Sequence, residues 1–156
     1  YTSSACIVNF YNNKSVMGGH KDDLELTFDK PVISLSVGRP AVFLLGGLTK
    51  EDEPVFPILV RSGDVMMLGG ESRLRFHGMA RILERDVEIE EVCDDIMKEC
   101  EKFQIKKYVD EDVYFSEDDL DDVCSFLMEH RINVNVRQVL PDGVESIQDA
   151  LDVMQS

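Results

Sequence analysis

Short apolar runs punctuated by glycine and proline fill most of the chain outside residues 84–130, and they predict β-strands. The predicted strands cover about residues 4–10, 16–22, 31–37, 40–45, 55–61, 64–68, 73–82 and 131–139. Many short strands separated by turns are typical of a closed or double-sheet, mainly β architecture.

A helical period replaces this pattern in the second half of the chain. Ile89, Val92, Ile96, Cys100 and Phe103 recur at helical spacing and predict an amphipathic helix over about residues 87–103. Residues 104–115 are expected to form a loop. Ser116-x-x-Asp119 is a capping-box pattern and predicts a second helix that reaches about residue 130. The apolar spacing after Pro141-Asp142-Gly143 predicts a closing C-terminal helix.

Negative charge is concentrated in the same segment. The chain has a formal net charge of −15, and residues 84–122 carry 17 acidic and 5 basic side chains, whereas residues 1–83 carry 9 of each. An acidic protein repels phosphate, so the overall charge argues against a nucleic-acid substrate, although the neutral first part weakens that argument. The acidic helical insertion at about 84–122 is either a partner-binding arm or a solvated cover.

The 156 residues suffice for one domain with a single sizeable core, so a single domain over residues 1–156 is expected. No apolar run approaches the roughly 20 residues of a membrane span, and no leader resembles a signal peptide. The four cysteines lack metal-site spacing and predict reduced thiols of an intracellular protein. Because the chain starts at Tyr1 rather than Met, an upstream part with substrate-binding elements is expected to be missing.

Candidate chemistry lies at three separated places. His20 and Asp22 can face the same side of a strand, and with the distant His77 they provide two imidazoles and one carboxylate, the set that holds non-haem Fe(II). In the strand at residues 131–139, Arg131, Asn133, Asn135 and Arg137 alternate with apolar residues and line one face. A buried face with two arginines requires an anionic partner, and a dicarboxylate fits best.

These residues resemble a known family, the AlkB-type dioxygenases, over roughly residues 5–82 and 120–140. The motifs that carry the resemblance are Asn9-Phe10-Tyr11, His20-Lys21-Asp22, the run from Pro31 to Leu48, Gly69-Gly70-Glu71-Ser72-Arg73-Leu74 with His77, and Arg131-x-Asn133-x-x-x-Arg137. Within the family, the chain looks closest to an animal branch, AlkB homologue one. The resemblance implies a double-stranded β-helix, or jelly roll, with iron in its mouth.

The resemblance also implies roles for individual residues. His20, Asp22 and His77 would bind Fe(II), and the reaction would consume O2 and 2-oxoglutarate. Arg131 with Tyr11 would hold the distal carboxylate of 2-oxoglutarate, Arg137 with Asn9 would steady its chelating end, and Asn133 would shape the pocket.

Glu25 and Arg73 are candidates for contacting the substrate or for supporting the metal ligands. Leu68 and Leu24 stand where bacterial relatives have a tryptophan and an aspartate, so the bacterial details of base recognition do not transfer.

The resulting hypothesis is an oxidative demethylase of N-methylated nucleobases, such as 1-methyladenine in tRNA or methylated bases in DNA, that releases formaldehyde, succinate and CO2. The alternatives are a protein demethylase or hydroxylase acting on histones, whose basic chains an acidic surface would attract, and an inactive acidic interaction module. The expected location is the nucleus, cytoplasm or mitochondrion. Without its upstream part, the chain is expected to bind both cofactors but to turn over nucleic acid poorly.

Overall fold

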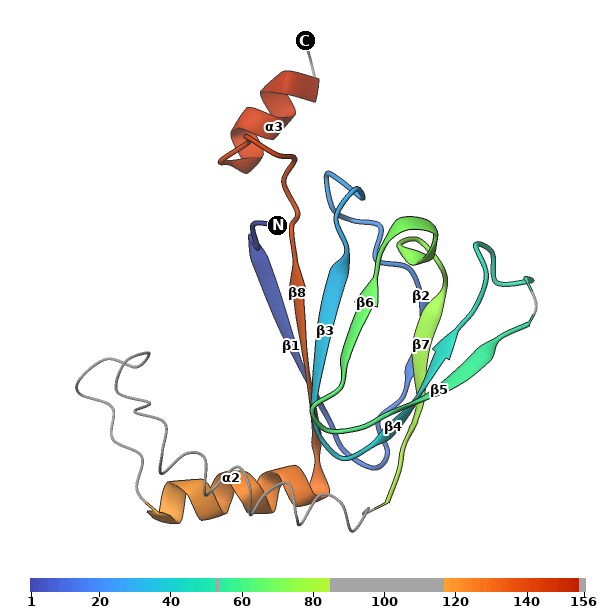
Figure 1. The fold of residues 1–156 in the computed structure, drawn as a ribbon, viewed down its shortest axis with the longest axis vertical. Helices are drawn as coiled ribbons and strands as arrows, with labels where there is room; N and C mark the ends of the chain where they lie inside the picture. The colour runs from blue at the N-terminus through green and yellow to red at the C-terminus, as the bar shows by residue number, and fades with distance from the viewer. Residues whose placement is uncertain (53, 85–116, 155–156) are drawn as a thin grey trace.

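Two four-stranded antiparallel sheets face each other in the computed structural model, which describes residues 1–52, 54–84 and 117–154. The first sheet has the order β1 (Ala5–Tyr11), β8 (Arg131–Arg137), β3 (Val32–Gly38) and β6 (Val65–Leu68). The second has the order β2 (Met17–His20), β7 (His77–Ile82), β4 (Ala41–Leu45) and β5 (Phe56–Val60). Figure 1 shows helix α2 (Glu117–Glu129) at one end of the sheets and α3 (Ile147–Met154) beyond the other end, after β8.

The strand order shows that the chain passes back and forth between the two sheets. Strands β1, β3, β6 and β8 lie in one sheet, and the strands between them in sequence lie in the other. This is the double-stranded β-helix that the sequence predicted, and the mainly β prediction is confirmed.

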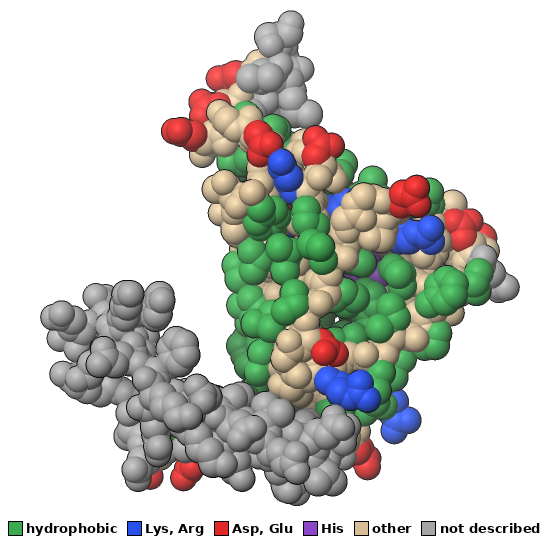
Figure 2. All heavy atoms as spheres, in the orientation of Figure 1, with side chains coloured by type: hydrophobic (Ala, Val, Ile, Leu, Met, Phe, Trp, Pro, Cys, Tyr) green, Lys and Arg blue, Asp and Glu red, His purple; other side chains and the backbone are tan. Residues whose placement is uncertain are grey.

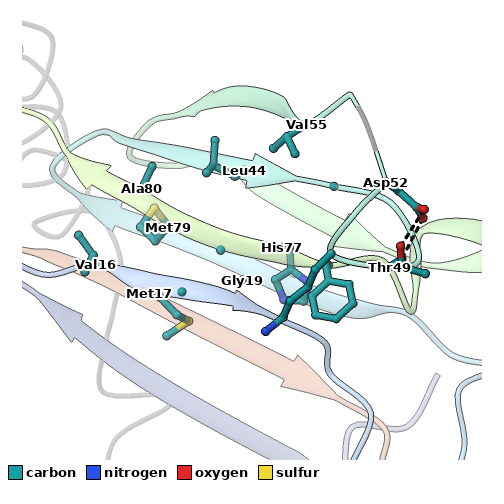
Figure 3. A pocket seen from close by; sticks show the side chains of 15 residues that line it. Val16, Met17, Gly19, Leu44, Thr49, Asp52, Val55, His77, Met79 and Ala80 are labelled. Atoms are coloured by element: carbon teal, nitrogen blue, oxygen red, sulfur yellow. Dashed lines mark hydrogen bonds between the residues drawn. The ribbon is translucent and has the colours of Figure 1, made fainter.

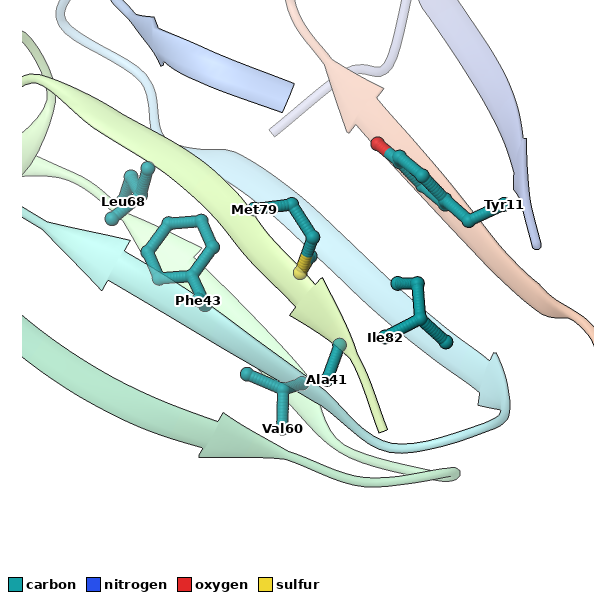
Figure 4. Packing of buried hydrophobic residues seen from close by; sticks show 7 residues of the cluster. All are labelled: Tyr11, Ala41, Phe43, Val60, Leu68, Met79 and Ile82. Carbon is teal, nitrogen blue, oxygen red and sulfur yellow. The ribbon is translucent and has the colours of Figure 1, made fainter. Parts of the chain in front are cut away.

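The hydrophobic core lies between the sheets and is small. Its buried members come from both sheets and are Tyr11, Ala41, Phe43, Val60, Leu68, Met79 and Ile82 (Figure 4). Met17, Leu45 and Met66 pack against this cluster. The core therefore fills only part of the space between the sheets, and polar side chains fill the rest.

The first sheet is polar on its inner face and apolar on its outer face. Tyr11 pairs with Arg131, Asn9 with Asn133, and Ser36 with Asn133, so their side chains share the inner face. On the outer face, large apolar side chains are exposed, and hydrophobic atoms cover much of this side in Figure 2. These exposed residues are Val8, Phe10, Leu35, Val65 and Met67. The inner face of this sheet thus carries the candidate chemistry.

Most predicted elements agree with the structure, with one clear correction. The second and third predicted helices are confirmed as α2 and α3, whereas residues 87–103 and 104–115 lie outside the described residues. The predicted strand 73–82 is wrong at its start, since β7 begins only at His77. A 3₁₀ turn (η1, Gly70–Ser72) comes first, and the Ser72 hydroxyl donates to the Gly69 carbonyl oxygen at 2.8 Å and bends the chain there.

The described helices are short. None of those in the described parts of the chain is long and apolar enough to span a membrane.

Candidate metal and co-substrate site

The three predicted metal ligands converge at the ends of β2 and β7. His20 and His77 are cross-strand partners, and their ring centroids lie 4.4 Å apart. Asp22 follows the end of β2, and its Oδ2 lies 3.7 Å from Nε2 of His77. One ligand atom from each residue lies within 4.8 Å of the others. The strand pairing therefore brings together the set that the sequence predicted.

The backbone fixes which imidazole nitrogen each histidine offers to a metal. Nδ1 of His20 lies 3.0 Å from the Gly18 carbonyl oxygen, and Nδ1 of His77 lies 3.0 Å from that of Arg75. Because a carbonyl oxygen only accepts, the neutral form of each ring carries its proton on Nδ1 and keeps the Nε2 lone pair free. This is the protonation state that a metal ligand requires.

The surroundings of His77 also favour its neutral form. Burial lowers the pKa of His77 below its ordinary value, and the His20 ring and the Arg137 guanidinium lower it further. The Arg75 carbonyl and Asp22 act in the opposite direction but do not reverse the shift. His77 is thus neutral at pH 7 and ready to bind a cation. Two imidazoles with one carboxylate are a donor set that fits Fe(II).

Arg131 is a buried cation without a carboxylate partner in the described part of the chain. It is 1 % exposed, and its guanidinium donates to the Ser36 hydroxyl at 2.7 Å and to the Arg39 carbonyl at 3.3 Å. Its Nε finds no hydrogen-bond acceptor among the described atoms. Burial lowers the pKa of Arg131, yet an arginine stays charged at neutral pH. A carboxylate beside Arg131 would balance this buried charge.

Tyr11 lies across from Arg131 and completes this end of the site. The two residues are cross-strand partners, and the Tyr11 hydroxyl is bonded only weakly, to the Met17 sulfur at 3.8 Å. Burial raises the pKa of Tyr11 above its ordinary value, so its hydroxyl is a proton donor at neutral pH. A guanidinium and a phenol hydroxyl side by side can bind one carboxylate.

A cavity between the sheets joins these two groups. Its lining combines the candidate metal ligands His20, Asp22 and His77, called the metal-binding cluster below, with Arg131 and Tyr11 at the other end. The remaining lining residues are Met17, Ser34, Phe43, Met66, Leu68, Gly78, Met79, Asn133 and Asn135. A molecule with two carboxylates could therefore reach both Arg131 and a metal at His20, Asp22 and His77.

Asn133 lines the cavity, and Asn9 does not. Asn9 is the cross-strand partner of Asn133 on the neighbouring strand β1 and faces the same side of the sheet. The Asn133 amide donates to the Leu35 carbonyl at 3.3 Å. Two serines were missed by the sequence analysis. Ser34 lines the cavity and bonds to Asn135, whereas Ser36 is fully buried and accepts a hydrogen bond from Arg131. The alternation Ser34-x-Ser36 in a predicted strand was the available signal.

Arg137 is held by carboxylates, in contrast to Arg131. It contacts the Asp22 carboxylate at 3.2 Å and forms a short hydrogen bond to Glu25. Arg73 lies 3.2 Å from Glu25 Oε2 and donates to the Asp22 carbonyl oxygen at 2.6 Å. The side chains of Glu25 and Arg73 are each only 3 % exposed, so this geometry favours support of Asp22 over contact with a large substrate.

An apolar groove of about 380 Å³ adjoins the cavity (Figure 3). It lies along β2, β7 and β4 and is bordered by the loop between β4 and β5, where Thr49 donates twice to Asp52 at 2.8 Å. Met17, His77, Gly78 and Met79 line both hollows. Apolar surface thus reaches the metal-binding cluster from a second side.

Comparison with known proteins adds independent findings. The family model of the 2OG-Fe(II) oxygenase superfamily matches residues 1–137. The DNA N(6)-methyladenine demethylase ALKBH1A of Arabidopsis thaliana is 35% identical over 89% of this chain and 35% of its own length. The nucleic acid dioxygenase ALKBH1 of Homo sapiens is 34% identical over 90% of this chain and 35% of its own length.

Two further similarities agree with these. The Escherichia coli dioxygenase AlkB is 39% identical over 51% of this chain and 36% of its own length. The solved structure of OsALKBH1 superimposes with a TM-score of 0.59 at 27% identity, over 88% of this chain and 51% of that chain. The chain therefore spans about a third of the length of these curated relatives.

Proposed function

The chain belongs to the 2OG-Fe(II) oxygenase superfamily, and from that premise we propose that it is the catalytic core of a nucleic-acid demethylase. Its cofactors are Fe(II), 2-oxoglutarate and O2. Its substrates are N-methylated nucleobases, with 1-methyladenine in tRNA first and methylated bases in DNA second.

One observation carries the proposal: a metal-binding cluster and a buried, carboxylate-free arginine share one cavity. His20, Asp22 and His77 offer the donors, and Arg131 requires an anion. A dicarboxylate that chelates the metal with one end and reaches Arg131 with the other satisfies both requirements.

The chain's own residues divide the work. Arg131 and Tyr11 hold the distal carboxylate of 2-oxoglutarate, and Ser36 keeps the Arg131 guanidinium in place. Asn133 shapes the cavity wall, and Arg137 orients Asp22. Asn9, which the resemblance pairs with Arg137 at the chelating end of 2-oxoglutarate, is the cross-strand partner of Asn133 on the same inner face.

Fe(II) held by His20, Asp22 and His77 would supply the oxidation chemistry, with O2 as oxidant and 2-oxoglutarate as co-reductant. Hydroxylation of the N-methyl group would then give succinate, CO2, formaldehyde and the demethylated base. The apolar residues around the cluster, Phe43, Leu68 and Met79, limit access of water.

Two observations support nucleic acid as the substrate: the similar proteins are described as nucleic-acid enzymes, and two lysines lie next to the metal-binding cluster. The ammonium groups of Lys21 and Lys50 lie 4.8 and 5.6 Å from the Phe76 ring centroid, and Lys21 and Phe76 directly adjoin the metal-binding histidines in sequence. Cations at this position favour a phosphate backbone.

A protein substrate is the second candidate, and a specific observation favours it. The formal net charge of −15 attracts basic chains such as histone tails and repels polynucleotides over long distances. The two candidates share the cofactors and the cavity, so only the choice of substrate separates them.

The first test is anaerobic titration of Fe(II) into the chain with 2-oxoglutarate, recording the metal-to-ligand charge-transfer band in visible light. We expect the band in the wild type, its loss in His77→Ala, and its retention in the matched control His130→Ala, whose ring stacks on Phe126 in α2. A folded wild type without the band would leave the inactive interaction module as the better description.

The second test compares substrates by the release of succinate and formaldehyde. RNA and DNA oligonucleotides with 1-methyladenine should stimulate release above the level reached with unmethylated oligonucleotides. Stimulation by methylated histone peptides alone would overturn the nucleic-acid assignment and leave the cofactor assignment intact.

A further inference from the structure

Glu25 follows the candidate metal ligand Asp22 by three positions, and its side chain is buried. Its carboxylate is almost completely buried, and guanidinium groups approach it from two sides. Arg73 lies 3.2 Å from Oε2, and Arg137 bonds to Oε1. By contrast, the side chain of the preceding residue, Leu24, is 95 % exposed. The segment as a whole is therefore not buried, and Glu25 faces inward because it pairs with the two arginines.

Both arginines also bind Asp22, at different atoms. Arg137 contacts the Asp22 carboxylate at 3.2 Å, and Arg73 donates to the Asp22 backbone carbonyl at 2.6 Å. Arg73 is further fixed by a bond from its Nε to the Lys30 carbonyl at 3.1 Å. Glu25 therefore lies behind the two groups that hold a metal ligand in place.

We propose that Glu25 is a positioning residue for the metal site, which balances Arg73 and Arg137 so that the Asp22 carboxylate stays available to the metal. This inference rests on the proposed function, because it assumes that Asp22 is a metal ligand. It assigns Glu25 to support of the metal site in place of substrate contact.

The charges explain the effect. With Glu25 ionised, two carboxylates face two guanidiniums, and the group is neutral. Without the Glu25 charge, Asp22 is the remaining carboxylate for both cations, and the site gains one positive charge where a divalent cation must bind. Coulomb repulsion then weakens metal binding, whereas a dianion such as 2-oxoglutarate is not disfavoured.

The test measures metal and co-substrate binding separately in Glu25→Gln. Calorimetric titration with Mn(II), a redox-stable probe for Fe(II), should show an affinity on the order of 10- to 100-fold weaker than in the wild type. At saturating Mn(II), 2-oxoglutarate should bind at least as tightly as in the wild type. A merely structural defect would weaken both ligands together.

Asp23→Asn is the matched control, because it removes the same charge from an exposed neighbour. It should leave Mn(II) affinity within about twofold of the wild type, since exposed charges are screened by solvent and salt.

A charge-compensating variant guards against loss of folding. Glu25→Gln with Arg73→Met removes one charge of each sign, and it should recover most of the Mn(II) affinity and raise the melting temperature above that of Glu25→Gln alone. If the double variant binds Mn(II) no better than the single variant, the charge-balance account is wrong.

Two further results would overturn the inference: Mn(II) affinity in folded Glu25→Gln equal to that of the wild type, or equal losses for Mn(II) and 2-oxoglutarate. A wild type that binds no Mn(II) would instead overturn the proposed function, so the two failures are distinguishable.

Discussion

Arg131 and Arg137 lie on the same face of β8 but differ in what balances their charge. Arg137 is paired with Asp22 and Glu25, whereas Arg131 contacts a hydroxyl and a backbone carbonyl in the described structure. A buried guanidinium without a carboxylate costs folding free energy, and a ligand that supplies the carboxylate recovers it. The residue proposed to bind the co-substrate is thus also a source of instability when no ligand carboxylate is bound.

Arg131→Met tests whether Arg131 lowers stability in the ligand-free protein and binds the co-substrate. Without 2-oxoglutarate, the variant should melt at the same temperature as the wild type or higher, because a buried charge without a directly contacting carboxylate is gone. With Mn(II) present, 2-oxoglutarate should raise the melting temperature of the wild type but not of the variant, and its affinity should fall on the order of 10- to 100-fold. A variant that is still stabilised by 2-oxoglutarate would place the distal carboxylate elsewhere.

Glu25 gives the protein a pH-dependent contribution to stability. Burial pushes the pKa of Glu25 upward, but its own backbone N–H and the Arg137 and Arg73 side chains outweigh this, so the pKa lies below its ordinary value. A carboxylate with a lowered folded-state pKa stabilises the fold above its unfolded value of about 4.3 and loses that contribution as pH falls through the folded value.

Urea unfolding of wild type and Glu25→Gln should therefore differ most near pH 7. The gap between their free energies of unfolding should narrow as pH falls below about 4.3, where Glu25 becomes protonated in the unfolded and then in the folded state. A gap that stays constant down to pH 3 would show that the ion pairs of Glu25 do not stabilise the fold.

At the scale of elements, the turn between β3 and β4 fixes where β8 begins. Gly38 ends β3 with φ +84° and is the cross-strand partner of Arg131. A Cβ at Gly38 would overlap the His130 carbonyl oxygen, which also accepts a bond from the Arg39 N–H at 2.9 Å. Close approach of two backbones at this glycine thus sets the position of Arg131 on its strand.

Gly38→Ala and Gly63→Ala form a matched pair, because both glycines have φ near +85° but only Gly38 faces a backbone atom. Gly63→Ala should lower the free energy of unfolding by about 1–2 kcal/mol, the cost of a left-handed conformation. Gly38→Ala should cost clearly more and should also weaken 2-oxoglutarate binding. Equal losses in thermal or urea unfolding would mean that the close approach is not needed.

The element scale also shows where local patterns mislead. The apolar spacing of residues 73–82 predicted one strand, but the turn at Gly70–Ser72 delays β7 to His77. Because of that delay, Arg73 turns inward to Lys30 and Asp22 instead of lying on a strand face. The hydrogen bonds between the Ser72 hydroxyl and the Gly69 backbone are local in sequence. The contacts that Arg73 makes after the bend are not, because Lys30 and Asp22 lie more than 40 residues away in sequence.

At the scale of the whole molecule, the two faces of the first sheet have the opposite polarity to those of an ordinary amphipathic sheet. Its polar face points into the site, and Val65 and Met67 on edge strand β6 are 63 % and 64 % exposed on the other side. Contiguous exposed apolar surface on an edge strand favours self-association.

Met67→Lys should therefore reduce concentration-dependent association, measured by light scattering, and leave Mn(II) binding unchanged. Met66→Lys is the matched control, because the neighbouring side chain faces inward and packs against the core. It should lower stability without improving solution behaviour. Unchanged association in Met67→Lys would show that this face does not drive it.

Much of the site followed from sequence alone for physical reasons. The period-two alternation of residues 131–137 assigns Arg131, Asn133 and Arg137 to one face whatever the sheet packs against, because successive side chains point to opposite sides. The short spacing of His20 and Asp22 likewise makes them neighbours. His77 was singled out as the distant second imidazole, and the resemblance to a family narrowed the mainly β fold to a double-stranded β-helix. The strand pairing then brings the three candidate ligands together.

What only the tertiary structure decided is which charges pair. Sequence placed both arginines beside a dicarboxylate, Arg131 at its distal end and Arg137 at its chelating end. The chain instead folds Glu25 against Arg137, whereas Arg131 contacts the Ser36 hydroxyl and a backbone carbonyl. Local pattern determines the direction of a side chain from its own backbone. The partner of each arginine lies about a hundred residues away in sequence, and the free energy of a buried charge depends on that partner. Only the packed fold therefore distinguishes Arg137, which is paired with carboxylates of the protein, from Arg131, which is proposed to pair with a carboxylate of the co-substrate.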